Sequence, residues 1–202
     1  MIMNINSPFA EIIESSLHSW IAQSWQWDAF PAFGSLVSIN SGSRLLFGIV
    51  HQVQTGSIDP MHSPFPYKKS QEQLLKDHPQ IFEFLKTTLT CVPIGYQEKG
   101  VINYLVACEP PKIHAFIELP KKDHAQQFFS SSHYLHVLFS LGNQVSCLDE
   151  LLLAILHYID TLGLLSEKKL HDFIETYSLL IGNDYRRLKI FLQRTEKHIL
   201  IR

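Results

Sequence analysis

The sequence predicts an α+β fold, with a small antiparallel β-barrel over residues 1–120 and an α-helical domain over residues 121–202. Three observations predict it. Before Pro120, glycine and proline recur between short apolar runs rich in Val, Ile and Phe, which is typical of strands and turns. After Pro120 there is no proline, and Leu and Ile recur at helical spacing. A segment of helical character at about residues 70–90 is expected as an insertion in the barrel.

The bulk composition is that of an ordinary globular protein. The chain has 202 residues and a net charge of −2, which does not favour a nucleic-acid backbone as its main partner. Its three cysteines, Cys91, Cys108 and Cys147, are far apart and lack metal-site spacing, so we expect reduced, buried thiols in a cytoplasmic protein. The sequence has no signal-peptide pattern and no apolar stretch of about 18 residues, so no contact with a membrane is expected.

The clearest strand signal is a hairpin. Residues 35–39 (SLVSI) alternate between apolar and polar, residues 40–43 (NSGS) have turn chemistry, and residues 44–53 form the return strand. Gly48 within the return strand predicts a bulge or a sharp bend. Three further strands are expected at residues 90–97, 101–108 and 112–119.

The insertion follows a proline-rich segment, residues 57–67, that is predicted to be an exposed loop. Residues 70–89 are expected to be helical, with Asp77 as a cap and Pro79 in a first turn. Its apolar residues would lie on one face of that helix: Ile81, Phe82, Leu85 and Leu89. This helix is a reasonable docking element.

The last part of the chain predicts four helices, at residues 134–141, 148–162, 166–181 and from 184 onward. Ser166 and Asp184 are expected to cap the last two, and glycine follows the first three. The second helix carries a continuous apolar stripe: Leu151, Leu152, Ile155, Leu156 and Ile159.

The first thirty residues fit two interpretations. Pro8, Ile13, Leu17 and Trp20 have the spacing of a capped helix, and periodicity alone favours it. The Ser, Trp and Ile content is also compatible with strands.

Several segments resemble HAS-barrel domains, the small β-barrel shared by HerA-type DNA translocases and ATP synthase catalytic subunits. The resemblance rests mainly on turn and core residues: Pro31, Phe33, Gly34, Ser35, Leu36 and Val37, followed by Gly48–Val50. Residues 109–119, 149–156 and 184–194 resemble the closing strand and helical tail of stand-alone bacterial, particularly cyanobacterial, proteins of this type. The resemblance implies strands at Ala10–Glu14 and Ser19–Gln23, which replaces the helix that periodicity favours.

The resemblance implies a non-catalytic role. In related ATPases the barrel organises the ring and docks accessory subunits. This chain has no GxxxxGK[ST] motif, so nucleotide hydrolysis is not implied.

No residue pattern predicts an active site, a cofactor site or a metal site. His133 and His136, with His124 upstream, lack the carboxylate and third ligand of a zinc site. Other weak patterns are a His114–Glu118 pair on one predicted strand face and an S-x-x-K match from Ser166 to Lys169, where Ser166 is better explained as a helix cap.

The sequence leaves three functions open. Two of them are kinds of binding, and the third and weakest is a histidine- or metal-dependent hydrolase. The first hypothesis is a protein-binding or assembly module, with a protein partner or self-association. The second is a binder of single-stranded nucleic acid that uses tryptophans and a basic last helix. The candidate interaction residues are Trp20, Trp25, Trp27, Phe82, Arg186 and Arg187.

Overall fold

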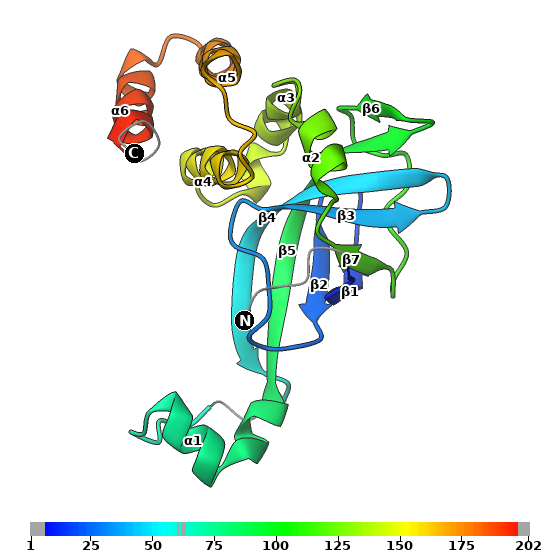
Figure 1. Ribbon diagram of the computed structural model, residues 1–202, viewed down its shortest axis with the longest axis vertical. Coiled ribbons are helices and arrows are strands. Elements are labelled where there is room, and N and C mark those ends of the chain that lie inside the picture. Colours follow the sequence, from blue (N-terminus) through cyan, green and yellow to red (C-terminus); the bar gives the residue numbers. More distant parts are fainter. Residues whose placement is uncertain (1–6, 60, 62–63, 198–202) are drawn as a thin grey trace.

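A computed structural model describes residues 7–59, 61 and 64–197 (Figure 1). Within them, seven antiparallel strands form one sheet in the order β2-β1-β7-β3-β4-β5-β6, and pairing of β2 with β5 closes six of them into a barrel. The strands are β1 Ala10–Ser15, β2 Trp20–Ser24, β3 Leu36–Ser41, β4 Arg44–Ser57, β5 Leu85–Glu98, β6 Val101–Asn103 and β7 Phe116–Glu118. The predicted α+β class, with an N-terminal antiparallel barrel followed by helices, is confirmed.

The N-terminal segment forms strands, so the helix that periodicity favours is wrong. Alternate residues face the barrel core, with Ala10 and Ile12 of β1 and Trp20 and Ala22 of β2 at most 2% exposed. A period of two explains this burial, whereas a helical period does not. β1 pairs with β2, which follows it in the chain, and with β7, which is about a hundred residues away. These pairings decide that the segment is extended, and local periodicity does not show them.

The predicted hairpin forms as β3 and β4, joined by a turn at Gly42 and Ser43 with a φ of +63° at Gly42. The predicted irregularity at Gly48 is also present, because the β4–β5 register shifts between Phe47 and Gly48. A Cβ at position 48 would lie 2.7 Å from the ring of Trp20. Glycine therefore lets the largest side chain of the barrel core fit beside β4.

The insertion is helical as far as Phe84, and Pro79 lies in a first helical turn as predicted, but the predicted helical character does not extend to Leu89. It consists of α1 (Gln71–Asp77) and a 3₁₀ helix, η1 (Pro79–Phe84), and β5 begins directly afterwards at Leu85. Leu85 and Leu89 therefore do not share a helix face with Ile81 and Phe82. Pairing with β4 and β2 overrides the local helical pattern, and Leu89 is fully buried inside the barrel.

The cap prediction for Asp77 is also wrong. Asp77 is the last residue of α1, and its carboxylate accepts a hydrogen bond from Lys69 Nζ at 2.9 Å. Ser70 is the residue that caps α1, in a capping box with Gln73.

Two predicted strands are shorter than expected. β6 ends at Asn103, and β7 covers three residues of the predicted 112–119. The segment between them contains Pro110 and Pro111, which cannot donate to a strand ladder. His114 belongs to the predicted strand, but its φ is +68° and it lies in a turn outside β7.

The helical part contains the four predicted helices and, before them, a fifth that the sequence did not predict, α2. Its helices are α2 Lys122–Phe128, α3 Tyr134–Ser140, α4 Leu148–Thr161, α5 Glu167–Leu180 and α6 Tyr185–Thr195, with a 3₁₀ turn, η2, at Gly142–Gln144. The predicted caps are present, since Ser166 accepts from Lys169 N and Asp184 accepts from Arg187 N.

The helices pack on one end of the barrel and share a core with it (Figure 1). The predicted stripe of α4 is buried throughout, at 4% exposure or less. It belongs to the same cluster as Leu36, Phe47 and Ile49 of the barrel wall, while a second cluster around Trp20 fills the barrel interior. The molecule therefore has one core inside the barrel and one between the barrel and the helices.

In the described ranges, no helix combines the length and the apolar character that crossing a bilayer requires.

Candidate functional site

The insertion forms an arm that projects from the barrel. We define the arm as residues 58–84. They lie between Ser57 and Leu85, which form the last pair of the β4–β5 ribbon. Figure 1 shows α1 beyond the end of the barrel opposite the helices. Neither α1 nor η1 contains a buried residue. The arm therefore has no core of its own, and its position is set by its root.

Several large apolar side chains of the arm are exposed. Met61 is 87% exposed, Phe65 72% and Phe84 61%, and Ile58, Tyr67 and Leu75 are also exposed. Within the arm, Tyr67 makes ring contacts with Phe65 and His78, each with centroids 5.7 Å apart. Single exposed apolar residues are common on proteins, but a group on a projecting element is typical of an interaction surface.

The root of the arm is anchored by Trp27. Its ring stacks on Phe82 of η1, with centroids 5.3 Å apart, and its carbonyl accepts a hydrogen bond from the buried Thr87 hydroxyl. Thr87 also bonds to Thr55 across the ribbon, at 2.7 Å. Trp27 and Phe82 are both half-buried by this contact. They fix the arm to the barrel, and Phe84 at the end of η1 stays exposed beside them.

The other two tryptophans have different surroundings. Trp20 is 2% exposed inside the barrel, where no base can reach it. Trp25 is 54% exposed and makes an edge-to-face contact with Phe116, which is 53% exposed, at 5.3 Å. Of the three tryptophans, only Trp25 offers an exposed aromatic face.

The basic last helix is partly neutralised by α4. The guanidinium of Arg187 donates to both carboxylate oxygens of Asp149, at 2.6 and 2.8 Å. Arg194 makes a bidentate contact of the same kind with Glu150. The hydrogen bond from Arg194 lowers the pKa of the Glu150 carboxyl. Arg186 is exposed, whereas Arg187 connects α6 to α4. Figure 1 places α6 and β7 on opposite sides of the molecule, so Arg186 and Trp25–Phe116 do not form one surface.

The histidine patterns do not assemble a site in the described residues. No group of three His, Cys, Asp or Glu there could hold a metal ion. His133 and His136 lie side by side with ring centroids 6.2 Å apart. The weak His114–Glu118 pattern does not form a pair. His114 has a positive φ, and its Nδ1 instead lies 2.5 Å from the Glu11 carboxylate on β1.

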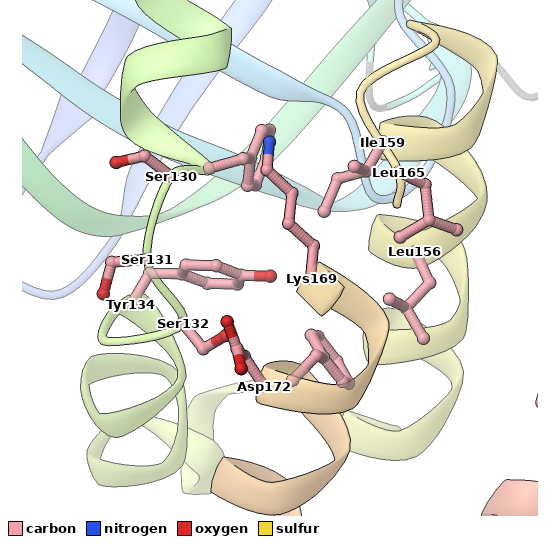
Figure 2. A pocket seen from close by; sticks show the side chains of 11 residues that line it. Ser130, Ser131, Ser132, Tyr134, Leu156, Ile159, Leu165, Lys169 and Asp172 are labelled. Carbon is pink, nitrogen blue, oxygen red and sulfur yellow. The ribbon is translucent and has the colours of Figure 1, made fainter. Parts of the chain in front are cut away.

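A small pocket lies between the loop Ser130–Ser132, α4 and α5 (Figure 2). Lys169, Asp172 and Tyr134 contribute polar groups, and burial raises the pKa of the Tyr134 phenol. The cavity measures about 20 Å³, which is room for a water molecule and too little for a substrate. Ser166 caps α5 through its bond to Lys169 N at 3.3 Å, as the sequence predicts.

Only one of the three thiols is buried. Cys91 lies in the barrel core, and burial raises its pKa to about 12. Cys108 and Cys147 are exposed, so the prediction of three buried thiols is wrong. Cys147 precedes α4 and Cys108 lies in the irregular segment after β6, where neither is covered by the core.

Comparison with known proteins does not identify a relative. No protein-family model matches the chain, and no curated protein matches it.

The exposed residues of the arm are the part of the site that sequence reasoning missed. The sequence predicted Phe82 as the interaction residue of the insertion, but Phe82 stacks on Trp27 and anchors the arm. A signal was present at residues 64–67, where Phe65 lies between two prolines. An apolar residue held in such a segment has little chance to join a strand or a helix face.

Proposed function

We propose that the protein is a non-catalytic module for protein binding and assembly, and that the arm is its docking element. The observation that carries this proposal is the exposure of Phe65 and Phe84 on an arm that has no core. Burying apolar side chains against a partner supplies most of the affinity in such contacts, with aromatic residues prominent among the strong contributors. The Trp27–Phe82 anchor supports the proposal, because a fixed arm loses less conformational entropy when it binds.

The resemblance to HAS-barrel domains suggests the kind of partner. In that family the barrel organises ATPase rings and docks accessory subunits, so an oligomeric ATPase in the cytoplasm is our first expectation. The six-stranded closed barrel is compatible with this family but is not specific to it.

Two variants test the proposal. The arm variant replaces Phe65, in the proline-rich segment, and Phe84, at the end of η1, with serine. The control variant replaces Leu179 and Val101 with serine. Their exposures of 74% and 62% are similar to those of Phe65 and Phe84, but they lie on α5 and β6. Both remove two exposed apolar side chains, so both should keep the stability of the parent protein.

Each tagged protein is purified from its native cell, with and without nuclease, and its companions are identified by mass spectrometry. We expect a stable protein partner that survives nuclease, is retained by the control variant and is lost from the arm variant. A partner that the arm variant retains at the parent level would contradict docking through the arm.

A second candidate function, binding of single-stranded nucleic acid, is favoured by the exposed Trp25–Phe116 pair. Its test should avoid Arg187, whose replacement breaks the contact with Asp149 and confounds folding with binding. Trp25→Ala and Arg186→Glu are suitable instead. Affinity for a labelled oligonucleotide should fall steeply with salt and fall in both variants if this function is real. Unchanged or undetectable binding would exclude it.

A further inference from the structure

A polar pocket lies where the barrel meets the start of α2. It is enclosed by the β3–β4 turn, the β5–β6 turn at Lys99 and Gly100, and residues from 118–124, which lead from β7 into α2. Its volume is about 330 Å³, within the range of small-ligand sites. Among the described residues of its lining, Leu45 is the only apolar side chain. The pocket is therefore suited to a polar ligand.

Hydrogen bonds hold the elements around this pocket in place. Gln127 Nε2 on α2 donates to Gly100 O at 2.9 Å, and Gln97 Nε2 donates to the side-chain oxygen of Gln127, also at 2.9 Å. These bonds tie the β5–β6 turn to α2, which lies beside β6 in Figure 1. Asn40 Nδ2 donates to the Glu118 carboxylate at 3.4 Å and joins β3 to β7. The pocket is thus formed in advance, so binding requires little ordering of the chain.

Positive charge exceeds negative charge in the lining. Lys99 and Lys121 line the pocket and form no ion pair with any residue that the structure describes. Arg44 also lines it, but its guanidinium is neutralised by Glu98 at 3.0 Å. Glu118 is the one carboxylate among the described lining residues. Two free ammonium groups therefore face one carboxylate that is bonded to an amide.

Lys99 has a backbone conformation that does not favour lysine. Its φ is +50° and that of Gly100 is +80°, so both central residues of the two-residue turn are left-handed. Asn, Asp and Gly are the usual residues in such turns. Turn chemistry does not explain this lysine, whereas a role for its ammonium group does.

We propose that this pocket binds a small phosphorylated polyol, with Lys99 and Lys121 on the phosphate and Glu118 on a hydroxyl group. A phosphate monoester carries about 1.5 to 2 negative charges at neutral pH, which two ammonium groups balance. The Glu118 carboxylate repels a bare anion but accepts a hydrogen bond from a hydroxyl group. The site contains no residue of the arm, so it stands apart from the proposed protein docking.

Isothermal titration calorimetry of the full chain at low ionic strength tests the site, with glycerol phosphate as the probe. Lys99→Asn and Lys121→Gln should each weaken binding by about tenfold. Lys99→Asn places a favoured residue in the turn, and the Lys121 side chain makes no capping hydrogen bond, so neither change should unfold the protein. Lys122→Gln is the matched control, because the next residue of the chain does not line the pocket, and it should have no effect.

Methyl phosphate tests the contact with Glu118, because it is a phosphate monoester without a hydroxyl group. The parent protein should bind glycerol phosphate more tightly than methyl phosphate. Glu118→Gln removes the repulsion, so it should strengthen the binding of methyl phosphate and reduce this preference.

Three results overturn the proposal. The first is a parent protein that binds neither probe at millimolar concentration. The second is an equal loss of affinity in Lys121→Gln and Lys122→Gln, which would show general attraction to a positive surface. The third is a preference for glycerol phosphate that is absent from the parent or that Glu118→Gln leaves unchanged.

Discussion

Gly34 shows how a single residue sets the packing of the barrel against the helices. Its φ is +84°, and a Cβ there would lie 2.6 Å from Ala154 Cβ and 2.8 Å from the Ala154 carbonyl carbon in α4. Its N–H donates to Val50 O at 2.8 Å, which holds the backbone in this position. Any side chain at this position is therefore strained in its own backbone and also displaces α4.

Replacing Gly34 with alanine should destabilise the protein by about 2–4 kcal/mol, as the sum of backbone strain and overpacking. Gly42→Ala is the matched control, because Gly42 has a φ of +63° but nothing within 4 Å of a Cβ. It should cost only about 1–2 kcal/mol of left-handed strain. Urea unfolding of the two variants measures the difference, and equal losses would contradict the close approach of α4.

The cysteines should differ in reactivity. The exposed Cys108 and Cys147 should be alkylated by iodoacetamide in the native protein, while Cys91 should react only after unfolding. Its burial, which raises the pKa to about 12, keeps it protonated, and the barrel wall blocks the reagent. Mass spectrometry with and without urea counts the modified residues. Rapid modification of Cys91 in the native state would mean that the barrel opens.

Among the elements, the helices were the most predictable from sequence and the insertion the least. The stripe on α4 and the caps Ser166 and Asp184 are local signals, and the structure contains all of them. The start of β5 depends on pairing with β4 and β2, which are distant in sequence, so the local helical pattern through Leu89 was misleading. The ion pairs from α6 to α4 likewise join residues about forty positions apart, as the Arg194–Glu150 pair shows.

Acid should weaken the fold in two stages. Burial lowers the pKa of His51, so its neutral form stabilises the fold above the unfolded value of 6.5, and this stability is lost as the pH falls below it. Arg194 lowers the pKa of Glu150, whose contribution is present above the unfolded value of 4.5 and is lost below it. The unfolding free energy should therefore decrease stepwise from neutral pH into acid.

Urea unfolding at a series of pH values measures this dependence. His51→Gln should remove the decrease that begins near pH 6.5 and leave the more acidic one. Arg194→Gln should instead reduce the decrease below pH 4.5. A stability that rises on acidification over either interval would contradict these assignments.

For the whole molecule, the barrel and helices form one packed body, and the arm is an addition to it. The two cores contain residues of the barrel and of the helices from α2 to α6, and none from α1 or η1. Sequence pattern predicted this division into strands and helices, and the resemblance added the N-terminal strands. Neither could show which apolar residues stay exposed, because exposure of Phe65 and Phe84 depends on the direction in which the ribbon leaves the barrel.

Removal of the arm should therefore leave the rest of the protein folded. Replacing residues 58–84 by Asn-Gly joins Ser57 to Leu85, the last pair of the ribbon, through a two-residue turn. The unfolding free energy should decrease by less than about 2 kcal/mol, mainly from loss of the Trp27–Phe82 stack. Thermal unfolding followed by circular dichroism checks this, and an unfolded product would show that the arm supports the barrel.

The central claim is that the arm serves to bind protein and not to stabilise the fold. The most direct measurement is the amount of nuclease-resistant protein partner that is recovered with the arm variant relative to the control variant. The account predicts a loss confined to the arm variant at unchanged thermal stability. Equal recovery with both variants, or an arm variant that loses its stability together with its partner, would contradict it.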